Sequence, residues 1–205
     1  MLFLTDYKTI SGPTEGEYKD KGSVFLAFAY PIKTENDFRR NLETIKKMHP
    51  KANHHCYAFA LGPGHQAHRF SDDREPSGTA GRPIMSVIKS SDLTDIMIVV
   101  VRYFGGTLLG VQGLIQAYRG SSEMAVAKAD IIVKHITERF AIQFPYDRTG
   151  DIEYLIRKFD VEVVSREMTD RCMFTVDVPK QHVTAMVDTI RKSHPFVMDC
   201  EISAR

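Results

Sequence analysis

Residues that could do chemistry concentrate in one stretch of the chain, from Phe70 to Tyr118. It opens with FSDDREPSGTAGRP, which places three carboxylates, two prolines and two glycines within a few residues. Such a segment is too polar and too kinked for the interior of a helix or strand, so we expect a loop. Its carboxylates, Asp72, Asp73 and Glu75, could hold Mg²⁺ beside a phosphate. Loop carboxylates more often cap helices and turns, and we favour that role.

A second group lies where a strand passes into a helix. The run IMIVVVRYF is β-branched and apolar without alternation, which is typical of a strand buried on both faces at the centre of a sheet. Gly105 and Gly106 end the run, and apolar residues at helical spacing follow to Tyr118. Amide groups at a helix start attract anions, and Arg74, Arg82 or Arg102 could add countercharge to a bound phosphate or carboxylate. Tight packing of the helix on the sheet would explain the same glycines equally well.

Known nucleotide-binding and catalytic motifs do not fit these residues. Gly105 and Gly110 have the spacing of a Walker loop, but Val111-Gln112 stands where Lys and Ser/Thr are required. Gly106, Gly110 and Gly113 do not have the Rossmann spacing either. There is no G-x-S-x-G elbow, and Cys56 falls in an expected buried strand. The sequence therefore offers no identifiable nucleophile.

SDDREPSGTAGRP followed by VVVRYFGGTLLGVQGLIQAY resembles the signature of the IMPACT family, and the chain is similar to its bacterial, YigZ-like branch. The resemblance implies a first domain like domain 2 of a small-subunit ribosomal protein and domain IV of elongation factor G. It implies a second domain like domain V of that factor. Eukaryotic members regulate translation by binding an activator of a stress kinase, but this chain lacks their extra N-terminal domain and we do not carry that partnership over. The family usually has Gly at the position of Arg74, which raises the question of a positive φ angle there.

The elements around these motifs predict a two-domain α+β protein. We expect a hairpin that turns at Lys21-Gly22, a helix capped by Thr34 and ended by Pro50, a strand from His54, and a helix that begins near Thr79 with Thr79 as its cap. We place the domain boundary between 1–137 and 138–205. The second domain reads βαββαβ, a ferredoxin-like arrangement, with a tight turn at Thr169-Asp170 and a last strand over 196–202.

Composition excludes some classes of protein and leaves others open. The net charge is +1, so no global basic field indicates nucleic-acid binding, and residues 1–137 are only slightly more basic than 138–205. Three widely spaced cysteines favour a reducing compartment, and no targeting segment or membrane span is seen, so we expect a cytoplasmic protein. Five of the eight histidines lie between His49 and His68, but their spacing matches no zinc motif and we favour structural roles.

Our first hypothesis is a non-catalytic binding protein linked to translation, whose partner is RNA, a ribosomal component or an associated protein. The alternative is an enzyme or sensor that binds a phosphorylated small molecule at the 72–82 loop and the Gly105-Gly106 turn. We predict no cofactor and no metal, and the oligomeric state stays open. The expected binding residues, shared by both hypotheses, are Asp72, Asp73, Glu75, Ser77, Gly78, Thr79, Gly81, Arg82, Arg102, Gly105 and Gly106.

Overall fold

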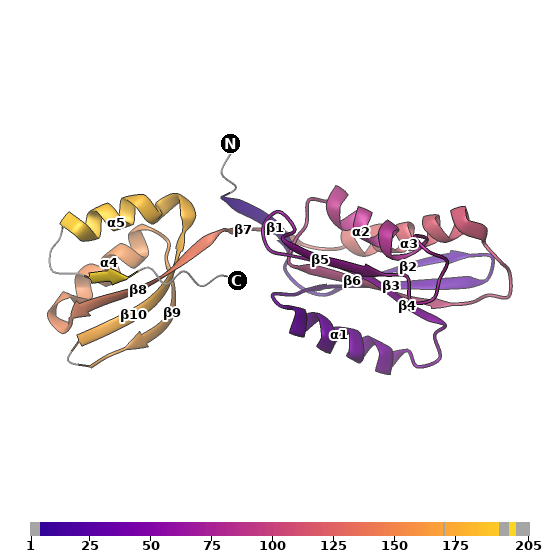
Figure 1. Cartoon of the computed structure of the whole chain (residues 1–205), viewed down its shortest axis with the longest axis horizontal. Coiled ribbons are helices and arrows are strands. Elements are labelled where there is room, and N and C mark those ends of the chain that lie inside the picture. Colours follow the sequence, from indigo (N-terminus) through magenta and orange to yellow (C-terminus); the bar gives the residue numbers. More distant parts are fainter. Residues whose placement is uncertain (1–4, 170, 193–196, 200–205) are drawn as a thin grey trace. The chain divides into compact units, whose positions relative to one another are not determined.

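The computed structural model describes residues 5–169, 171–192 and 197–199. The chain divides into two compact units (Figure 1). One unit is Tyr7–Lys134, and the other combines His135–Arg205 with the short N-terminal segment Met1–Asp6. None of the helices in the described part of the chain is long and apolar enough to cross a membrane.

A five-stranded antiparallel sheet forms the centre of the Tyr7–Lys134 unit. Its order is β2-β3-β6-β4-β5, so β6 lies in the middle, as the apolar run predicts. All but the last residue of β6 are buried, because helices cover both faces of the sheet. The strands are β2 (Thr14–Asp20), β3 (Ser23–Pro31), β4 (His54–Leu61), β5 (Ala67–Ser71) and β6 (Ile96–Tyr103).

The predicted hairpin at Lys21-Gly22 is present. Asp20 pairs with Ser23, which leaves a two-residue turn between β2 and β3. Both turn residues have positive φ angles, 44° for Lys21 and 79° for Gly22. This is the combination that a type I′ turn requires, and such a turn matches the twist of the strands that it joins.

One face of the sheet is covered by α1 (Glu35–Met48). Its first turn has a full capping box: the Asp37 amide donates to the Thr34 hydroxyl, while the Asp37 carboxylate accepts from the Thr34 amide. Phe38 and Ile45 are the buried residues of the helix, and they pack with apolar side chains from β3, β4 and β6. The helix ends at His49, directly before Pro50.

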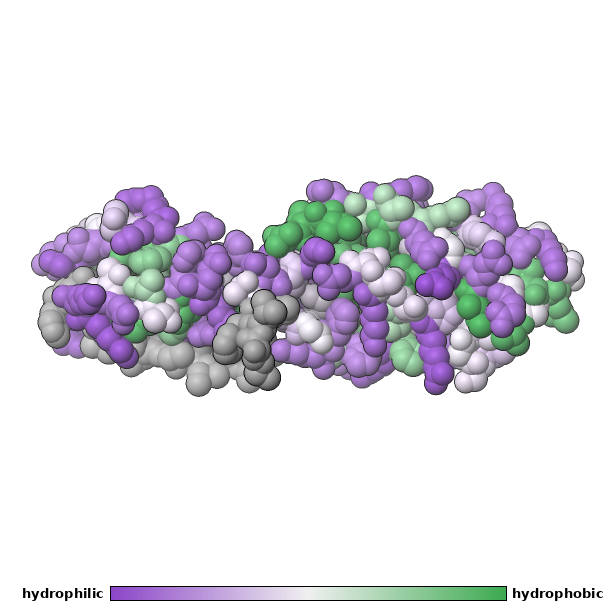
Figure 2. Space-filling view, turned by 90° about the horizontal axis from the view of Figure 1, so that it is seen from above, coloured by the Kyte–Doolittle hydropathy of each residue, from purple (hydrophilic) through white to green (hydrophobic). Residues whose placement is uncertain are grey.

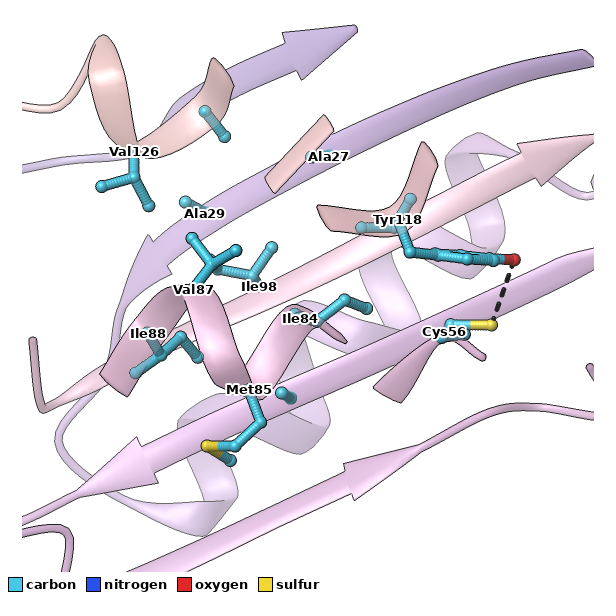
Figure 3. Close-up of a cluster of buried hydrophobic side chains, with 14 of the residues drawn as sticks. Ala27, Ala29, Cys56, Ile84, Met85, Val87, Ile88, Ile98, Tyr118 and Val126 are labelled. Carbon is cyan, nitrogen blue, oxygen red and sulfur yellow. Dashed lines mark hydrogen bonds between the residues drawn. The ribbon is translucent and has the colours of Figure 1, made fainter. Parts of the chain in front are cut away.

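The opposite face is covered by α2 (Gly81–Ser90) and α3 (Gly110–Ala127). Figure 3 shows the core that they enclose, with Ile84 and Ile88 of α2 beside Ile98 of β6 and Tyr118 of α3 near Cys56 of β4. Tyr118 is fully buried and its ring meets that of Phe25 edge to face, with 5.1 Å between centroids. Tyr118 therefore anchors α3 on the sheet, close to the loop between β5 and α2.

Two short strands that the sequence analysis does not predict form a separate ribbon. β1 (Asp6–Ile10) pairs with β7 (Ile131–His135), which follows directly after α3. Both strands mix charged and apolar residues over only five positions, so neither has the alternation that would mark it from sequence.

The second unit has the predicted βαββαβ order. Its sheet, β11-β8-β10-β9, is antiparallel, and one face packs on the helices through a single apolar core. The ferredoxin-like expectation is confirmed in this mixed α+β fold; Asp170 and, of the predicted last strand, residues 196 and 200–202 lie outside the described residues. The elements are β8 (Thr137–Pro145), α4 (Thr149–Lys158), β9 (Glu162–Glu167), β10 (Arg171–Pro179), α5 (Val183–Lys192) and β11 (Val197–Asp199), with 3-10 turns at Tyr146–Arg148 and Lys180–His182.

Candidate functional site

Asp72 organises the loop between β5 and α2. Its Oδ1 accepts from the amides of Ala80 and Gly81 at 3.0 and 2.8 Å, and its Oδ2 accepts from the Gly78 amide at 2.9 Å. The predicted cap was wrong: the N-cap position is Ala80, and the Thr79 hydroxyl donates to the Pro76 carbonyl instead. Since Asp72 takes these amides, the start of α2 already holds an anion, which is the protein's own carboxylate.

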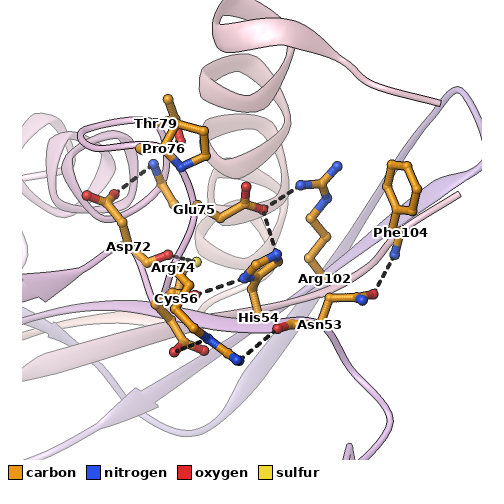
Figure 4. Close-up of polar contacts among 12 residues, drawn as sticks. Asn53, His54, Cys56, Asp72, Arg74, Glu75, Pro76, Thr79, Arg102 and Phe104 are labelled. Atoms are coloured by element: carbon orange, nitrogen blue, oxygen red, sulfur yellow. Dashed lines mark hydrogen bonds and ion pairs between the residues drawn. The ribbon is translucent and has the colours of Figure 1, made fainter. Parts of the chain in front are cut away.

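Glu75 points inward from the same loop and joins β6 to α3 (Figure 4). Its Oε1 accepts from Arg102 Nη1 at 2.6 Å and from the Tyr118 hydroxyl at 2.8 Å. His54 Nε2 lies 3.8 Å from the same oxygen. Glu75 and Arg102 are both buried, Arg102 with only 5% of its surface exposed. The pair therefore ties the loop to the end of the central strand.

Arg102 is also enclosed by aromatic rings. Its guanidinium carbon lies 5.4 Å from the centroid of the Phe25 ring and 5.6 Å from that of Phe104. Its Nε has no hydrogen-bond partner in the structure. Because the guanidinium is covered on two sides and paired with Glu75, Arg102 is not presented to solvent. Direct contact of Arg102 with a phosphate, as the sequence analysis expects, does not fit this burial.

Cys56 has no features of a nucleophile. It is fully buried, and its Sγ donates to the Asp72 carbonyl at 3.0 Å and lies 3.3 Å from the Tyr118 hydroxyl. Burial raises the pKa of the Cys56 thiol far above its ordinary value, with a smaller contribution from nearby carboxylates, of which Glu75 is the largest. Burial raises the pKa of Tyr118 in the same way. Both groups therefore stay protonated and act as hydrogen-bond donors within the fold.

Asp73 connects the loop to the start of β4. Its carboxylate accepts from the His55 amide at 2.7 Å, and its carbonyl lies 2.8 Å from His54 Nδ1. Together with Asp72 and Glu75, Asp73 completes a set of three loop carboxylates that all accept from donors of the protein itself. The expected capping role of these residues describes their geometry better than magnesium binding does.

Arg74 adopts the left-handed conformation that favours glycine. Its φ angle is 70°, next to 38° for Asp73. A side chain in this region costs free energy, and the family resemblance places Gly here. The Arg74 side chain is 78% exposed, and its Nη2 donates to the Asn53 carbonyl at 3.2 Å. Arg74 therefore combines a strained backbone conformation with a largely exposed side chain.

Gly105 and Gly106 have different reasons to be glycine. A Cβ on Gly105 would lie 1.9 Å from the Gly22 carbonyl carbon, so close packing on the β2–β3 turn excludes any side chain. The Gly105 amide donates to the Ser23 hydroxyl at 3.1 Å and is not open to an anion. Gly106 has a φ angle of 89° and nothing near the position of a Cβ. Packing thus accounts for Gly105, whereas Gly106 serves the turn itself.

The exposed residues around this network form a surface that we call the loop face: Arg74, Ser77, Arg82, Phe104 and Leu108. Asn53 links two of them, since its carbonyl accepts from Arg74 and its Oδ1 accepts from the Phe104 amide. Arg82 approaches Gly78 in the loop. Phe104 is 46% exposed and Leu108 is 82% exposed. Figure 2 shows hydrophobic surface at the end of this unit to which the β2–β3 hairpin extends in Figure 1.

The loop face is the part of the predicted site that a partner could reach. Of the predicted residues, Ser77 and Arg82 lie on it, and Gly105 and Gly106 are also exposed. The other predicted residues hold the loop, its helix and its strand together through contacts with the protein itself. They are Asp72, Asp73, Glu75, Gly78, Thr79, Gly81, Arg102 and Gly105. The sequence analysis missed Phe104, Leu108, Asn53 and Tyr118 as members of the site. The signal for Leu108 was available, because GGTLLG puts apolar residues in a glycine-rich turn.

The histidines between His49 and His68 occupy separate places. His49 Nδ1 lies 2.9 Å from the Tyr103 hydroxyl, His65 Nε2 lies 2.8 Å from the Leu93 carbonyl, and His54 contacts Asp73. Within the described ranges, no group of three or more His, Cys, Asp or Glu residues is placed to hold a metal ion. Burial lowers the pKa of His55, so its buried imidazole is neutral at pH 7.

Both units of the chain match known family models. The family described as Impact N-terminal domain matches residues 21–126, and a domain of unknown function, DUF1949, matches residues 142–192. An IMPACT family member of Haemophilus influenzae is 36% identical over 80% of this chain and 80% of its own length. YigZ of Escherichia coli is 33% identical over 69% of this chain and 71% of its own.

A more distant relative and a solved structure extend the comparison. The IMPACT homolog of Saccharomyces cerevisiae is 33% identical over 44% of this chain and 36% of its own length. A crystal structure described as a hypothetical protein superposes with a TM-score of 0.76 at 26% identity, over 99% of this chain and 100% of that one. The fold, both matched domains and the level of identity establish that this chain belongs to the IMPACT family.

Proposed function

We propose that this chain is a non-catalytic binding protein that works in translation or its regulation and contacts RNA or a ribosomal component through the loop face. The observation that supports this proposal most is Arg74, an exposed arginine held in a strained left-handed backbone conformation. Strained backbone conformations cluster at functional sites, and here the strained residue presents its side chain to solvent. The family resemblance supplies the link to translation.

The chemistry of the loop face suits a nucleic-acid partner. Arg74 and Arg82 can neutralise phosphates, and an arginine can grip one with two parallel hydrogen bonds. Phe104 offers an aromatic face on which an unpaired base can stack. These contacts are local, which is compatible with a chain of net charge +1. Arg102 supports this surface from below by packing against the Phe104 ring.

The alternative, an enzyme or sensor that takes a phosphorylated small molecule at the 72–82 loop and the Gly105-Gly106 turn, has less support. The anion-binding groups that it requires are engaged: Asp72 takes the amides at the start of α2, and Ser23 takes the Gly105 amide. Cys56 is buried, and its thiol donates a hydrogen bond to the Asp72 carbonyl. No activated nucleophile faces solvent among these residues.

Filter binding with ribosomal RNA and with purified ribosomal subunits, across a series of salt concentrations, tests the proposal. We expect binding at low salt that weakens linearly on a logarithmic plot as salt rises, because counterions are released when phosphates are neutralised. Binding to the subunits but not to free RNA would identify a ribosomal protein as the partner. No binding to either at low salt would rule the proposal out.

A further inference from the structure

A concave cavity of about 330 Å³ lies at the other end of the sheet from the loop face. It is formed beside Asp95, just before β6, whereas Arg102 lies near the end of the same strand. At about 3.3 Å per residue, the two ends are roughly 20 Å apart. Every lining residue belongs to the Tyr7–Lys134 unit: Thr9, Ile10, Ser11, Pro31, Ile32, Lys33, Asp37, Arg40, Asn41, Asp95, Ile132 and Lys134.

Three cations line this cavity from two separate elements. Lys33 directly precedes the N-cap of α1, and Arg40 follows one turn into the helix. Lys134 comes from β7, where Ile132 and Lys134 are half-buried while Ile131, Val133 and His135 are exposed. Since alternate strand residues share a face, Ile132 and Lys134 are the β7 side chains that face the cavity.

The two carboxylates in the lining are already matched by internal donors. Asp37 accepts from the Thr34 hydroxyl, from the Lys33 and Thr34 amides and from Arg40 Nη2 at 2.7 Å. Asp95 Oδ1 accepts from the Gly62 amide at 2.8 Å, and Asp95 is also hydrogen-bonded to the Tyr7 hydroxyl. Asp37 is therefore paired with the Arg40 guanidinium, whereas Asp95 is held by neutral donors and keeps its negative charge.

Lys33 and Lys134 are left without an ion-pair partner among the described residues. Asp95 offsets one of these two charges, so the lining has a net charge of +1 and favours an anion such as a phosphate monoester, whose charge is close to −2 near neutral pH. Arg40 shares its guanidinium with Asp37 but can donate through its remaining N–H groups, and Ser11 and Asn41 add neutral donors. The apolar part of the cavity is a floor formed by Ile10 and Ile32, which are almost fully buried, beside the half-buried Ile132.

We propose that this cavity binds a small molecule that carries a phosphate monoester on a partly apolar body. Its volume is within the range of small-molecule sites, and such sites combine an apolar wall with a few convergent polar groups. The proposal is independent of the loop face, because it uses other residues at the other end of the sheet. It places a ligand site in a protein whose main surface contacts a macromolecule.

Isothermal titration calorimetry of the full chain at low salt tests the proposal with three probes: phenyl phosphate, inorganic phosphate and benzyl alcohol. Phenyl phosphate should bind, inorganic phosphate should bind more weakly because it has no apolar body, and benzyl alcohol should not bind. The variant Lys33→Gln/Lys134→Gln should weaken phenyl phosphate binding at least about tenfold, the loss expected for removal of charged hydrogen bonds. The matched control is Lys46→Gln/Lys47→Gln, which removes the same charge from the last turn of α1.

The outcomes separate site binding from general attraction. An affinity of the control within about twofold of the unchanged protein, together with methyl shifts of Ile32 and Ile132 on addition of phenyl phosphate, supports the site. Equal losses in both variants would show nonspecific attraction and overturn the proposal, as would benzyl alcohol that binds as tightly as phenyl phosphate. Equal affinities for phenyl phosphate and inorganic phosphate would show that the apolar body of the ligand makes no contact, and would contradict that part of the proposal. No binding of phenyl phosphate at millimolar concentration would end it.

Discussion

Glu75 and Arg102 form a buried ion pair with 2.6 Å between Oε1 and Nη1, and this contact closes the 72–80 loop onto the central strand. The two residues come from segments that are 27 positions apart in the sequence. Tyr118 donates a hydrogen bond to the same carboxylate from α3. Loop, strand and helix thus meet at one carboxylate, and the exposed loop face is built on top of it.

The pair makes Arg102→Ala a stability variant rather than a binding variant. Removing one partner of a buried ion pair leaves the other charge without compensation and typically costs about 3–5 kcal/mol. We expect urea unfolding of Arg102→Ala to show a loss in this range. Glu75→Leu/Arg102→Met, which removes both charges, should lose less than Arg102→Ala alone. A stability of Arg102→Ala within about 1 kcal/mol of the unchanged protein would contradict the role given to the pair.

Arg74→Gly should change stability and binding in opposite directions. Glycine relieves the left-handed strain at φ 70°, which stabilises the folded state by roughly 1–2 kcal/mol. Part of this gain is lost because glycine has more conformational entropy in the unfolded chain. We expect a net gain of about 0.5–1 kcal/mol in the free energy of unfolding, measured by urea titration. Affinity for the partner should fall, because a phosphate contact is lost. A variant that is less stable than the unchanged protein would mean that the Arg74 side chain supports the fold.

Cys56 should resist modification in the folded protein. Burial raises the pKa of its thiol far above the ordinary value, so the reactive thiolate is scarce at pH 8 and the sulfur is inaccessible. Iodoacetamide followed by peptide mass spectrometry should find Cys56 unmodified until denaturant unfolds the first unit. Rapid labelling of Cys56 under native conditions would show that the loop opens easily and that the buried network is not as closed as described.

The capping box of α1 should make stability depend on acid pH through Asp37. The Thr34 hydroxyl, and then the Lys33 amide, hold the pKa of this carboxyl below its usual value of 3.8. A lowered folded pKa stabilises the protein above the unfolded pKa, and the contribution disappears as pH falls through the folded value. Asp37→Asn should therefore cost about 1 kcal/mol at pH 7 and progressively less below about pH 4. Thermal melts of Asp37→Asn and of the unchanged protein from pH 7 to pH 2.5 measure the difference in stability between them. The difference should shrink as the pH falls, and a constant difference would contradict the prediction.

The sequence predicts the elements of this fold better than the roles of its charged residues. The apolar run of β6, the hairpin at Lys21-Gly22 and the βαββαβ order follow from local patterns, and each is present. The sequence analysis gives Arg102 a role in binding an anion, but an arginine inside a strand buried on both faces needs a buried counterion. Which carboxylate provides it depends on tertiary contacts, and no local pattern points to Glu75.

The cavity that we propose as a phosphate monoester site could not be predicted from the sequence either. Lys33, Arg40 and Lys134 lie in segments that are distant in sequence, and none belongs to a recognisable motif. The pairing of β1 with β7, which brings Lys134 to the cavity, was not predicted either. Sites assembled from scattered surface residues are visible only after the chain has been folded, whereas the residues of the loop face come from two glycine-containing motifs that the sequence shows.

The most direct test of the account is the salt dependence of binding to ribosomal RNA or ribosomal subunits by Arg74→Gly/Arg82→Ala. Each phosphate contact contributes about 0.7–0.9 to the slope of log affinity against log salt, so the loss of two should flatten the slope by roughly 1.4–1.8. Lys46→Ala/Lys47→Ala removes the same charge from α1, on the other face of the sheet, and should keep the slope of the unchanged protein. A slope that is the same in Arg74→Gly/Arg82→Ala and in the unchanged protein would contradict binding through the loop face.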